Sequence, residues 1–415
     1  MVPKGWELSS IGKISDVSSG GTPSRNNEAY WNGNIPWVTT AEVQFKIIED
    51  TVEKITEEGL ANSSAKLFPA GTILMAMYGQ GKTRGQVAKL GIDASTNQAC
   101  AAIVLHTGYE VDFYYQFLIS QYENIREMAN SGGQQNLSGG IVKSIPVPVP
   151  PLTEQKKIAK ILSTWDNAIS VTEKLLTNSQ QQKKALMQQL LTGKKRLGLP
   201  AGSYEFKITR YGSIPKDWDY PAIKEICTQV SEKNSAAVDH PVLSCSKYDG
   251  FVDSLKYFNK KVYSDDLSGY RLIHRGCFGF PSNHIEEGSI GLQNLYDTGI
   301  VSPIYVVFRA SPTKVDNSYL YAVLKTDHYK QIFGAATNAS VDRRGSLRWK
   351  EFNQIHVPLP PLKEQQKISA VLSAADAEIT TLEKKLACLK DEKKALMQQL
   401  LTGKRRVKVD EAVAE

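Results

Sequence analysis

The sequence predicts an α+β protein in which two mixed α/β domains are joined by two long helices, paired as an antiparallel coiled coil within the chain. Three observations support this fold class. The twelve residues KKALMQQLLTGK occur twice, at 183–194 and 393–404. Each copy closes a long segment that contains no glycine or proline before its own last residues. The regions that precede these segments contain short apolar runs bounded by glycine and polar turns, which is typical of buried strands.

An internal repeat sets the domain boundaries. The stretch VPVPPLTEQKKIAKILS at 147–163 aligns without a gap with VPLPPLKEQQKISAVLS at 357–373, and VPKGW at 2–6 matches IPKDW at 214–218. Between these anchors the two halves look unrelated, so the pattern indicates a tandem duplication with diverged middles. The predicted parts are a first domain at 1–150, a first helix at 151–197, a second domain at 198–358 with a linker at 198–203, a second helix at 359–406 and a tail at 407–415.

Local signals mark where the two helices begin and end. Pro150 and Pro151 hold the chain extended before the first helix, and Gly193 and Gly403 stand where a left-handed C-terminal cap belongs. Apolar residues recur at alternating spacings of four and three, as in a coiled-coil seam. The predicted seam residues are Ile158, Leu162, Trp165, Ile169, Leu176, Leu186 and Leu190 in the first helix, and Ile368, Leu372, Ile379, Leu382, Leu386, Leu389, Leu396 and Leu400 in the second. Thr172, Ser179 and Lys183 interrupt the first seam.

A helix of this length needs a partner to cover its apolar seam. The simplest arrangement packs the two helices on each other, antiparallel, which makes one chain a pseudo-two-fold molecule. Packing of each helix on its own domain, or on a second copy of the chain, is the alternative. Because the middles differ, the pseudo-two-fold arrangement predicts two recognition surfaces for two different targets.

The diverged middles contain recognisable strands and helices. Residues 72–78 and 100–106 are predicted strands of the first domain, and residues 114–129 have helical spacing. In the second domain, 270–280 and 302–310 are predicted strands and 318–333 is predicted to be helical. Both middles end in a polar, glycine-containing loop just before the long helix, at 130–140 and 337–349.

Charge and cysteine content exclude some classes of protein. The net charge is +7, but residues 1–150 hold 11 basic against 14 acidic residues, while residues 151–197 hold 9 against 3. The positive charge therefore lies mainly on the first helix, and net charge alone does not establish DNA binding. The five cysteines are scattered without a CxxC pair, which predicts reduced thiols in the cytoplasm and no metal site.

The sequence contains no complete catalytic motif. MYGQGKTRG at 77–85 resembles a phosphate-binding loop, but a Walker A motif needs glycine where Ala76 stands. The six histidines have no metal-ligand spacing, and no nucleophile-elbow or S-adenosylmethionine motif is evident. We therefore expect a chain with no activity and no cofactor of its own.

The duplicated helix start carries a specific resemblance to a known family. The two variable regions, followed by PVPPLTEQKKI and PLPPLKEQQKI and then a long helix, resemble the DNA specificity subunit of Type I restriction–modification systems. Residues 20–39, 95–99 and 291–308 resemble parts of the target-recognition domains of that family. The resemblance covers essentially the whole chain, and the duplicated helix start is its most specific part.

The resemblance implies a function and partners. Each variable region would be a target-recognition domain that reads one half of a bipartite, asymmetric DNA site, with the two helices setting the distance between the halves. The family's subunit binds two methyltransferase subunits, which supply S-adenosylmethionine and methylate adenine at N6. Two restriction and translocation subunits, which use ATP and Mg²⁺, can join them. The chain itself would bind double-stranded DNA and no cofactor.

Polar loops supply the candidate DNA-binding residues, because arginine suits guanine and phosphate while glutamine and asparagine suit adenine. In the first domain these are Gln80, Lys82, Thr83, Arg84, Gln134, Gln135 and Asn136, and in the second Ser340, Arg343, Arg344 and Arg348. An ordinary charged hairpin turn remains the alternative for residues 77–85. Two other functions also remain: a methyltransferase or nuclease fused to its recognition domain, which would need a catalytic motif, and a coiled-coil scaffold that binds only proteins.

Overall fold

The computed structural model describes residues 2–79, 81–129, 136–210, 212–236, 238–337 and 346–408. The chain divides into two compact units, of which the first is made from two separate stretches of the sequence and the second from one. The first unit holds Met1–Lys174 and Glu383–Glu415, and the second holds Leu175–Leu382. Within the described ranges no helix is both long and apolar enough to cross a membrane.

A five-stranded sheet forms the centre of the first unit, in the order β2-β9-β6-β7-β4. All neighbours are antiparallel except β4 and β7. Its strands are β2 (Ser15–Ser19), β9 (Cys100–Leu105), β6 (Ile73–Ala76), β7 (Val87–Leu90) and β4 (Ile47–Ile48). The helices α3 (Val111–Ser120) and α4 (Tyr122–Glu127) follow β9.

Both faces of this sheet are covered, which explains the continuous apolar run of β6. Ile73 and Met75 pack with Phe113 of α3 in one core cluster. Leu74 and Ala76 point to the other face and pack in a second cluster. Strands buried on both faces are apolar throughout rather than alternating, so the predicted strands at 72–78 and 100–106 are confirmed.

A smaller sheet and short elements complete the first unit. The sheet has the order β5-β3-β8 and its strands are β5 (Glu53–Ile55), β3 (Trp31–Val38) and β8 (Ser95–Thr96). The pair β1 (Glu7–Ser10) and β10 (Pro146–Val149) is antiparallel. The short helices are α1 (Ile11–Ile14), η1 (Glu28–Tyr30), η2 (Thr40–Glu42), α2 (Glu57–Ala61) and α5 (Gly139–Ser144).

The second unit is built on a sheet of the same strand order, β13-β20-β17-β18. These strands are β13 (Cys227–Val230), β20 (Tyr305–Ala310), β17 (Phe278–Pro281) and β18 (Gly291–Leu292). They correspond in chain order and pairing to β2, β9, β6 and β7. The two middles, which look unrelated in sequence, therefore share a four-stranded scaffold.

Other elements of the second unit differ from those of the first. They are β11 (Phe206–Thr209), β12 (Gly212–Pro215), α7 (Ile223–Ile226), β14 (Leu243–Ser246), β15 (Gly250–Asp253), α8 (Ser254–Phe258), β16 (Arg271–His274), η3 (Ile285–Glu287) and β19 (Thr298–Val301). Between β20 and the last long helix, the described residues form α9 (Asn317–Leu324), α10 (Asp327–Ala336) and α11 (Trp349–Phe352). The helical region at 318–333 is thus two helices, because the Thr326 hydroxyl accepts from the Tyr329 N–H and caps a new start. The region at 114–129 is likewise divided, between α3 and α4 at Gln121.

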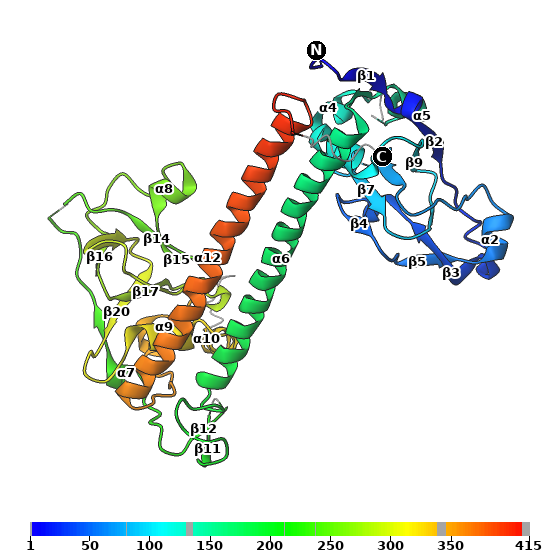
Figure 1. Cartoon of the computed structure of the whole chain (residues 1–415). Coiled ribbons are helices and arrows are strands. Elements are labelled where there is room, and N and C mark those ends of the chain that lie inside the picture. Colours follow the sequence, from blue (N-terminus) through cyan, green and yellow to red (C-terminus); the bar gives the residue numbers. More distant parts are fainter. Residues whose placement is uncertain are drawn as a thin grey trace. The chain divides into compact units, whose positions relative to one another are not determined.

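Two helices of 39 residues each, α6 (Leu152–Leu190) and α12 (Leu362–Leu400), run through the chain and lie side by side (Figure 1). In the first unit Lys393 pairs with Asp166 and Lys390 with Glu173. In the second unit Lys183 pairs with Asp376, and the Ser179 hydroxyl donates to Glu378. Residue numbers rise along one helix as they fall along the other, so the helices are antiparallel. The predicted intramolecular pair is confirmed.

The repeated sequences meet in one joint in the second unit. Arg196, just after α6, donates from Nε and Nη2 to Glu364 at the start of α12, at 2.9 and 2.6 Å. Its Nη1 donates to Asp217 of the IPKDW stretch at 2.7 Å. The guanidinium lies 5.9 Å from the centre of the Trp218 ring. The end of one helix, the start of the other and the short lead-in peptide therefore form one polar and aromatic cluster.

The equivalent residues form the same joint in the first unit. Arg406, after α12, donates to Glu154 at the start of α6, from Nε at 3.0 Å. Trp6 of the VPKGW stretch donates from its ring N–H to the same carboxylate at 3.1 Å. Each joint takes its helix end from one copy of the repeat and its helix start from the other. This is why both copies keep the same residues at both ends.

Candidate nucleic-acid interface

The loop between β6 and β7 carries the first group of candidate residues. Its base is closed by backbone bonds, from the Gly85 N–H to Ala76 and from the Ala76 N–H to Gln86, both at 2.9 Å. Gly85 has a φ of 83°, and a side chain there would approach Arg126, so glycine serves the turn. The loop is therefore a hairpin held against α4, and the turn explains Gly85 without a phosphate ligand.

Helix α4 fixes the orientation of this hairpin. The Tyr122 hydroxyl donates to the Lys82 carbonyl oxygen, and Arg126 donates to the Tyr122 hydroxyl at 2.6 Å. Lys82 itself is exposed, whereas Thr83 and Arg84 are half-buried. Arg84 lines a small surface hollow together with two glutamates of α4. Lys82 is thus the side chain best placed to meet an anion in solvent. Gln80 lies outside the described residues.

A second segment lies beside this hairpin. Leu137 is fully buried, and its N–H donates to the Met77 carbonyl at 2.9 Å. The Ser138 hydroxyl caps α5 by accepting from the Ile141 N–H at 3.2 Å. Asn136 is half-buried and directly precedes this anchor. The structure therefore brings Asn136 close to the 77–86 hairpin, while Gln134 and Gln135 lie outside the described residues.

The second unit repeats this arrangement with different residues. Leu347 is fully buried, and its N–H donates to the Ser282 carbonyl at 2.7 Å, just after β17. Arg348 is exposed at the N-cap of α11. The adjacent Trp349 packs against the core with its ring 5.7 Å from that of Phe308. Arg348 is thereby held on a fixed point of the scaffold. Ser340, Arg343 and Arg344 lie outside the described residues.

The sequence interpretation missed the loop at 282–290. It follows β17 and precedes β18, as the hairpin at 77–86 follows β6 and precedes β7. It presents Asn283 and His284, both half-exposed, beside the 346–348 segment. No motif marks these residues. The only available signal was their position after a buried strand, in the order shared by the two middles.

The potential metal-binding atoms of His284, Glu286 and Glu287 lie within 4.8 Å of one another. His284 already pairs with Glu287 at 3.3 Å. Carboxylates gathered on an exposed turn are common without a metal ion, so the cluster by itself does not indicate a metal site.

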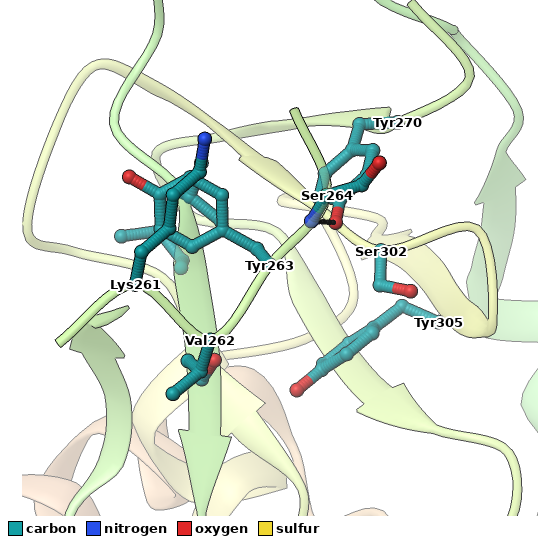
Figure 2. Close-up of a pocket in the computed structure, with 10 residues that line it drawn as sticks. Lys261, Val262, Tyr263, Ser264, Tyr270, Ser302 and Tyr305 are labelled. Atoms are coloured by element: carbon teal, nitrogen blue, oxygen red, sulfur yellow. Dashed lines mark hydrogen bonds between the residues drawn. The ribbon is translucent and has the colours of Figure 1, made fainter. Parts of the chain in front are cut away.

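A pocket of about 300 Å³ lies on another part of the second unit. Figure 2 shows Lys261 and Tyr263 on one side of it, and Ser264, Tyr270, Ser302 and Tyr305 on the other. The Tyr305 hydroxyl accepts from the Cys245 N–H at 2.9 Å, and burial raises its pKa to about 12. That hydroxyl therefore stays protonated at neutral pH and cannot act there as a base. Lys261 is paired with Asp265.

The predicted seam residues all lie at buried or half-buried positions. Ile158 and Leu162 pack with Leu400 in the main core cluster of the first unit, and Leu190 packs with Ile368 and Leu372 in that of the second. The remaining ones are half-buried along the helices: Trp165, Ile169, Leu176, Leu186, Ile379, Leu382, Leu386, Leu389 and Leu396. Thr172, one of the polar interruptions, is 3% exposed and its hydroxyl donates to the Ala168 carbonyl at 2.7 Å. The helix ends therefore serve both the helix pair and the cores of the units.

Comparison with known proteins places this geometry in a family. A family model described as Type I restriction modification DNA specificity domain matches residues 3–178 and again 215–390. The chain is 23% identical to the Type I restriction enzyme MjaIX specificity subunit of Methanocaldococcus jannaschii, over 98% of this chain and 95% of that protein. It is 27% identical to the MjaVIII specificity subunit of the same organism, over 98% and 94%. Over a shorter stretch of 176 residues the chain is 30% identical to the EcoR124I/EcoR124II specificity subunit of Escherichia coli. This match covers 41% of this chain and 43% of that protein.

A solved structure agrees on the fold. The S subunit of a Type I restriction–modification system from M. genitalium aligns with a TM-score of 0.59 over 96% of each chain, at 14% identity. At that identity the likeness shows a shared fold alone. It includes the pair of long helices that the sequence predicts.

Proposed function

The chain belongs to the Type I restriction–modification DNA specificity family, as a non-catalytic subunit for DNA target recognition, and from this we propose that it reads a bipartite, asymmetric site with one half-site for each unit. The first reading surface is formed by Lys82, Thr83 and Asn136. The second is formed by Asn283, His284 and Arg348.

One observation supports this proposal above the others. Two equivalent hydrogen bonds, which serve as anchors, run from the Leu137 N–H to the Met77 carbonyl in the first unit and from the Leu347 N–H to the Ser282 carbonyl in the second. Each joins a loop to the residue that directly follows the corresponding strand, β6 or β17. The exposed side chains beside the two anchors are nevertheless different. A common scaffold with different surface residues is what a reader of two unlike half-sites needs. A symmetric site would require like residues at both places.

The chemistry of the side chains fits DNA. Lys82 and Arg348 are exposed cations that can contact phosphates, and Arg348 can also donate to the O6 and N7 of guanine. The amides of Asn136 and Asn283 can pair with the N6 and N7 of adenine. Such contacts form on duplex DNA without any bond being broken, in agreement with a subunit that recognises and does not catalyse.

We further propose that the chain directs partner subunits to the DNA. Two methyltransferase subunits would bring S-adenosylmethionine and methylate adenine at N6, and two restriction subunits would bring ATP and Mg²⁺. This proposal rests on family membership. Exposed cationic residues at the helix ends, such as Lys194 and Lys404, are available for such partners.

Domain exchange tests the two-reader proposal. Residues 1–150 are replaced by those of another family member, and adenine methylation is mapped in a host genome that carries this chain with its methyltransferase partner. We expect one half-site to change while the other stays the same. A change in both half-sites, or a single uninterrupted recognition sequence, would contradict the proposal. A host that lacks the chain is the control for background methylation.

A further inference from the structure

The turn between β14 and β15 has an unusual surface for a turn of its size. Tyr248 at its tip is 79% exposed. The ammonium of Lys247 lies 5.1 Å from the centre of the Tyr248 ring. An aromatic ring beside a lysine is a combination that nucleic-acid-binding surfaces use, because the ring packs on a sugar or base and the cation meets a phosphate.

Hydrogen bonds make this turn rigid. The Ser246 hydroxyl oxygen accepts from the N–H groups of Tyr248 and Asp249, both at 3.2 Å. The Asp249 carboxylate accepts from Ser246 at 3.1 Å and from the Tyr257 hydroxyl at 2.9 Å. The one acidic side chain of the turn is therefore occupied within the protein, while Lys247 and Tyr248 face solvent. A partner would meet a preorganised surface, which lowers the entropy cost of binding.

Lys325 connects this turn to the candidate reading loop. Its ammonium donates to the Lys247 carbonyl at 2.8 Å and to the Gly288 carbonyl at 2.9 Å. Gly288 ends the helical turn η3 in the loop 282–290, whose first residue Ser282 is bound by Leu347. Burial lowers the pKa of Lys325, and the two carbonyl oxygens oppose this effect by accepting hydrogen bonds from the ammonium. The turn is therefore continuous with the second reading surface.

The segment after β15 adds exposed aromatic surface beside the turn. Its lysines Lys256 and Lys261 are paired with Asp253 and Asp265. Tyr257 and Phe258 are 47% and 42% exposed. In the first unit, the corresponding stretch between β2 and β6 holds β3, β4 and β5 instead, with β3 and β5 paired as antiparallel strands. The feature therefore belongs to the second unit alone.

We propose that Lys247 and Tyr248 form an additional DNA-contacting element of the second unit, with the Tyr248 ring against a sugar or base at the edge of the half-site and Lys247 on a phosphate. The ligand is duplex DNA. Lys325 is a positioning residue that holds the turn beside the reading loop. This inference rests on the proposed function, because it extends one of its two reading surfaces.

The test uses the full chain in complex with its methyltransferase partner. Tyr248→Ala, Tyr248→Phe and Lys247→Ala are compared with Ile208→Ala, a control at an apolar residue of β11 that is 93% exposed. Binding to a fluorescent duplex with the mapped site is measured by anisotropy at several salt concentrations. We expect Tyr248→Ala to weaken binding about tenfold, from the lost burial of the ring against a sugar or base edge, and Tyr248→Phe to retain most of the affinity. Lys247→Ala should reduce the slope of log K against log salt by about 0.9, the value of one phosphate contact.

The possible outcomes separate this inference from the function on which it rests. If the wild-type complex selects no bipartite site, the proposed function fails. If it selects one but Tyr248→Ala and Lys247→Ala match the Ile208→Ala control in affinity and salt slope, the inference alone is overturned. If Tyr248→Ala instead prevents assembly of the complex, as measured by its mass in gel filtration with light scattering, the turn is a protein interface and the inference is also overturned.

Discussion

Arg196 and Glu364 are 168 residues apart in the chain and form a bidentate salt bridge, with donor–acceptor distances of 2.9 and 2.6 Å. Only 6% of the Arg196 side chain and 13% of the Glu364 side chain are exposed. The equivalent pair in the first unit joins Arg406 to Glu154, where 41% of the arginine side chain is exposed. The two joints share their chemistry but differ in the burial of the arginine, while the glutamate side chains are 13% and 9% exposed, respectively.

This difference predicts unequal costs for equivalent substitutions. Arg196→Ala removes a guanidinium that is 6% exposed and pairs with both Glu364 and Asp217, which should lower the free energy of unfolding of the second unit by about 3–5 kcal/mol. Arg406→Ala should cost about 1–2 kcal/mol, because that guanidinium is 41% exposed and Trp6 still donates to Glu154. Urea denaturation followed by circular dichroism measures both. Equal losses for the two variants would show that burial does not set the cost.

The glycines at the two helix ends give a second prediction. Gly193 and Gly403 have φ angles of 68° and 69°, and a Cβ atom would come within 2.4 Å of Pro215 and Pro3, respectively. Alanine there combines left-handed strain with a clash, so we expect a loss of more than about 2 kcal/mol in the free energy of unfolding. Gly198→Ala is the matched control, because its φ is 86° and no atom lies within 4 Å of the added carbon. If Gly193→Ala lowered the free energy of unfolding no more than Gly198→Ala does, the contact with Pro215 would not contribute to the cost.

The two reading surfaces should be separable by single substitutions. Lys82→Ala should weaken binding through the first half-site and Arg348→Ala through the second. A lost base contact, as at Arg348, should cost about 1–3 kcal/mol and relax specificity at one position, whereas a lost phosphate contact, as at Lys82, should weaken binding about equally for all sequences. Selection of bound duplexes from a randomised pool, with each half-site varied in turn, measures the effect. Arg309→Ala, an exposed residue on the strand β20 away from the loops, is the control. If neither variant changes selection, the loops are assigned wrongly.

The helix pair should set the distance between the half-sites. A heptad inserted after Ser179 alone moves Lys183 out of register with Asp376 and leaves part of the seam uncovered, so we expect loss of folding. A second heptad inserted after Ile379 in α12 should restore the pairing and lengthen the helix pair by about 10 Å, or about three base pairs of DNA. Methylation mapping should then show the same half-sites with a longer spacer. An unchanged spacer in a folded double insertion would contradict this role.

The sequence by itself determined the duplication and the two long helices, and it favoured pairing of the helices over packing of each on its own domain or on a second copy. The duplication and the helices depend on local rules that a single stretch can satisfy. Pro150 and Pro151 exclude helix before Leu152, Gly193 ends the last turn, and the four-three spacing marks the seam. The observed helices, Leu152–Leu190 and Leu362–Leu400, follow from those signals. The buried strands at 72–78 and 100–106 were also predictable, because a short continuous apolar run between turn residues is typical of a strand that is covered on both faces.

Only the tertiary structure decided that the two middles share a scaffold and where their surfaces lie. The strand β6 reads ILMA and the corresponding β17 reads FGFP, because burial in a sheet requires apolar volume and not particular residues. Asn283 and His284 were missed because the contact that brings their loop to Arg348, from Leu347 to Ser282, spans 65 positions of the sequence and has no local signal. Arg84 and Lys82 stand two residues apart and look alike in the sequence, yet packing against α4 half-buries one and leaves the other in solvent. Which cation can meet DNA is thus set by long-range contacts, because these decide the exposure of each side chain.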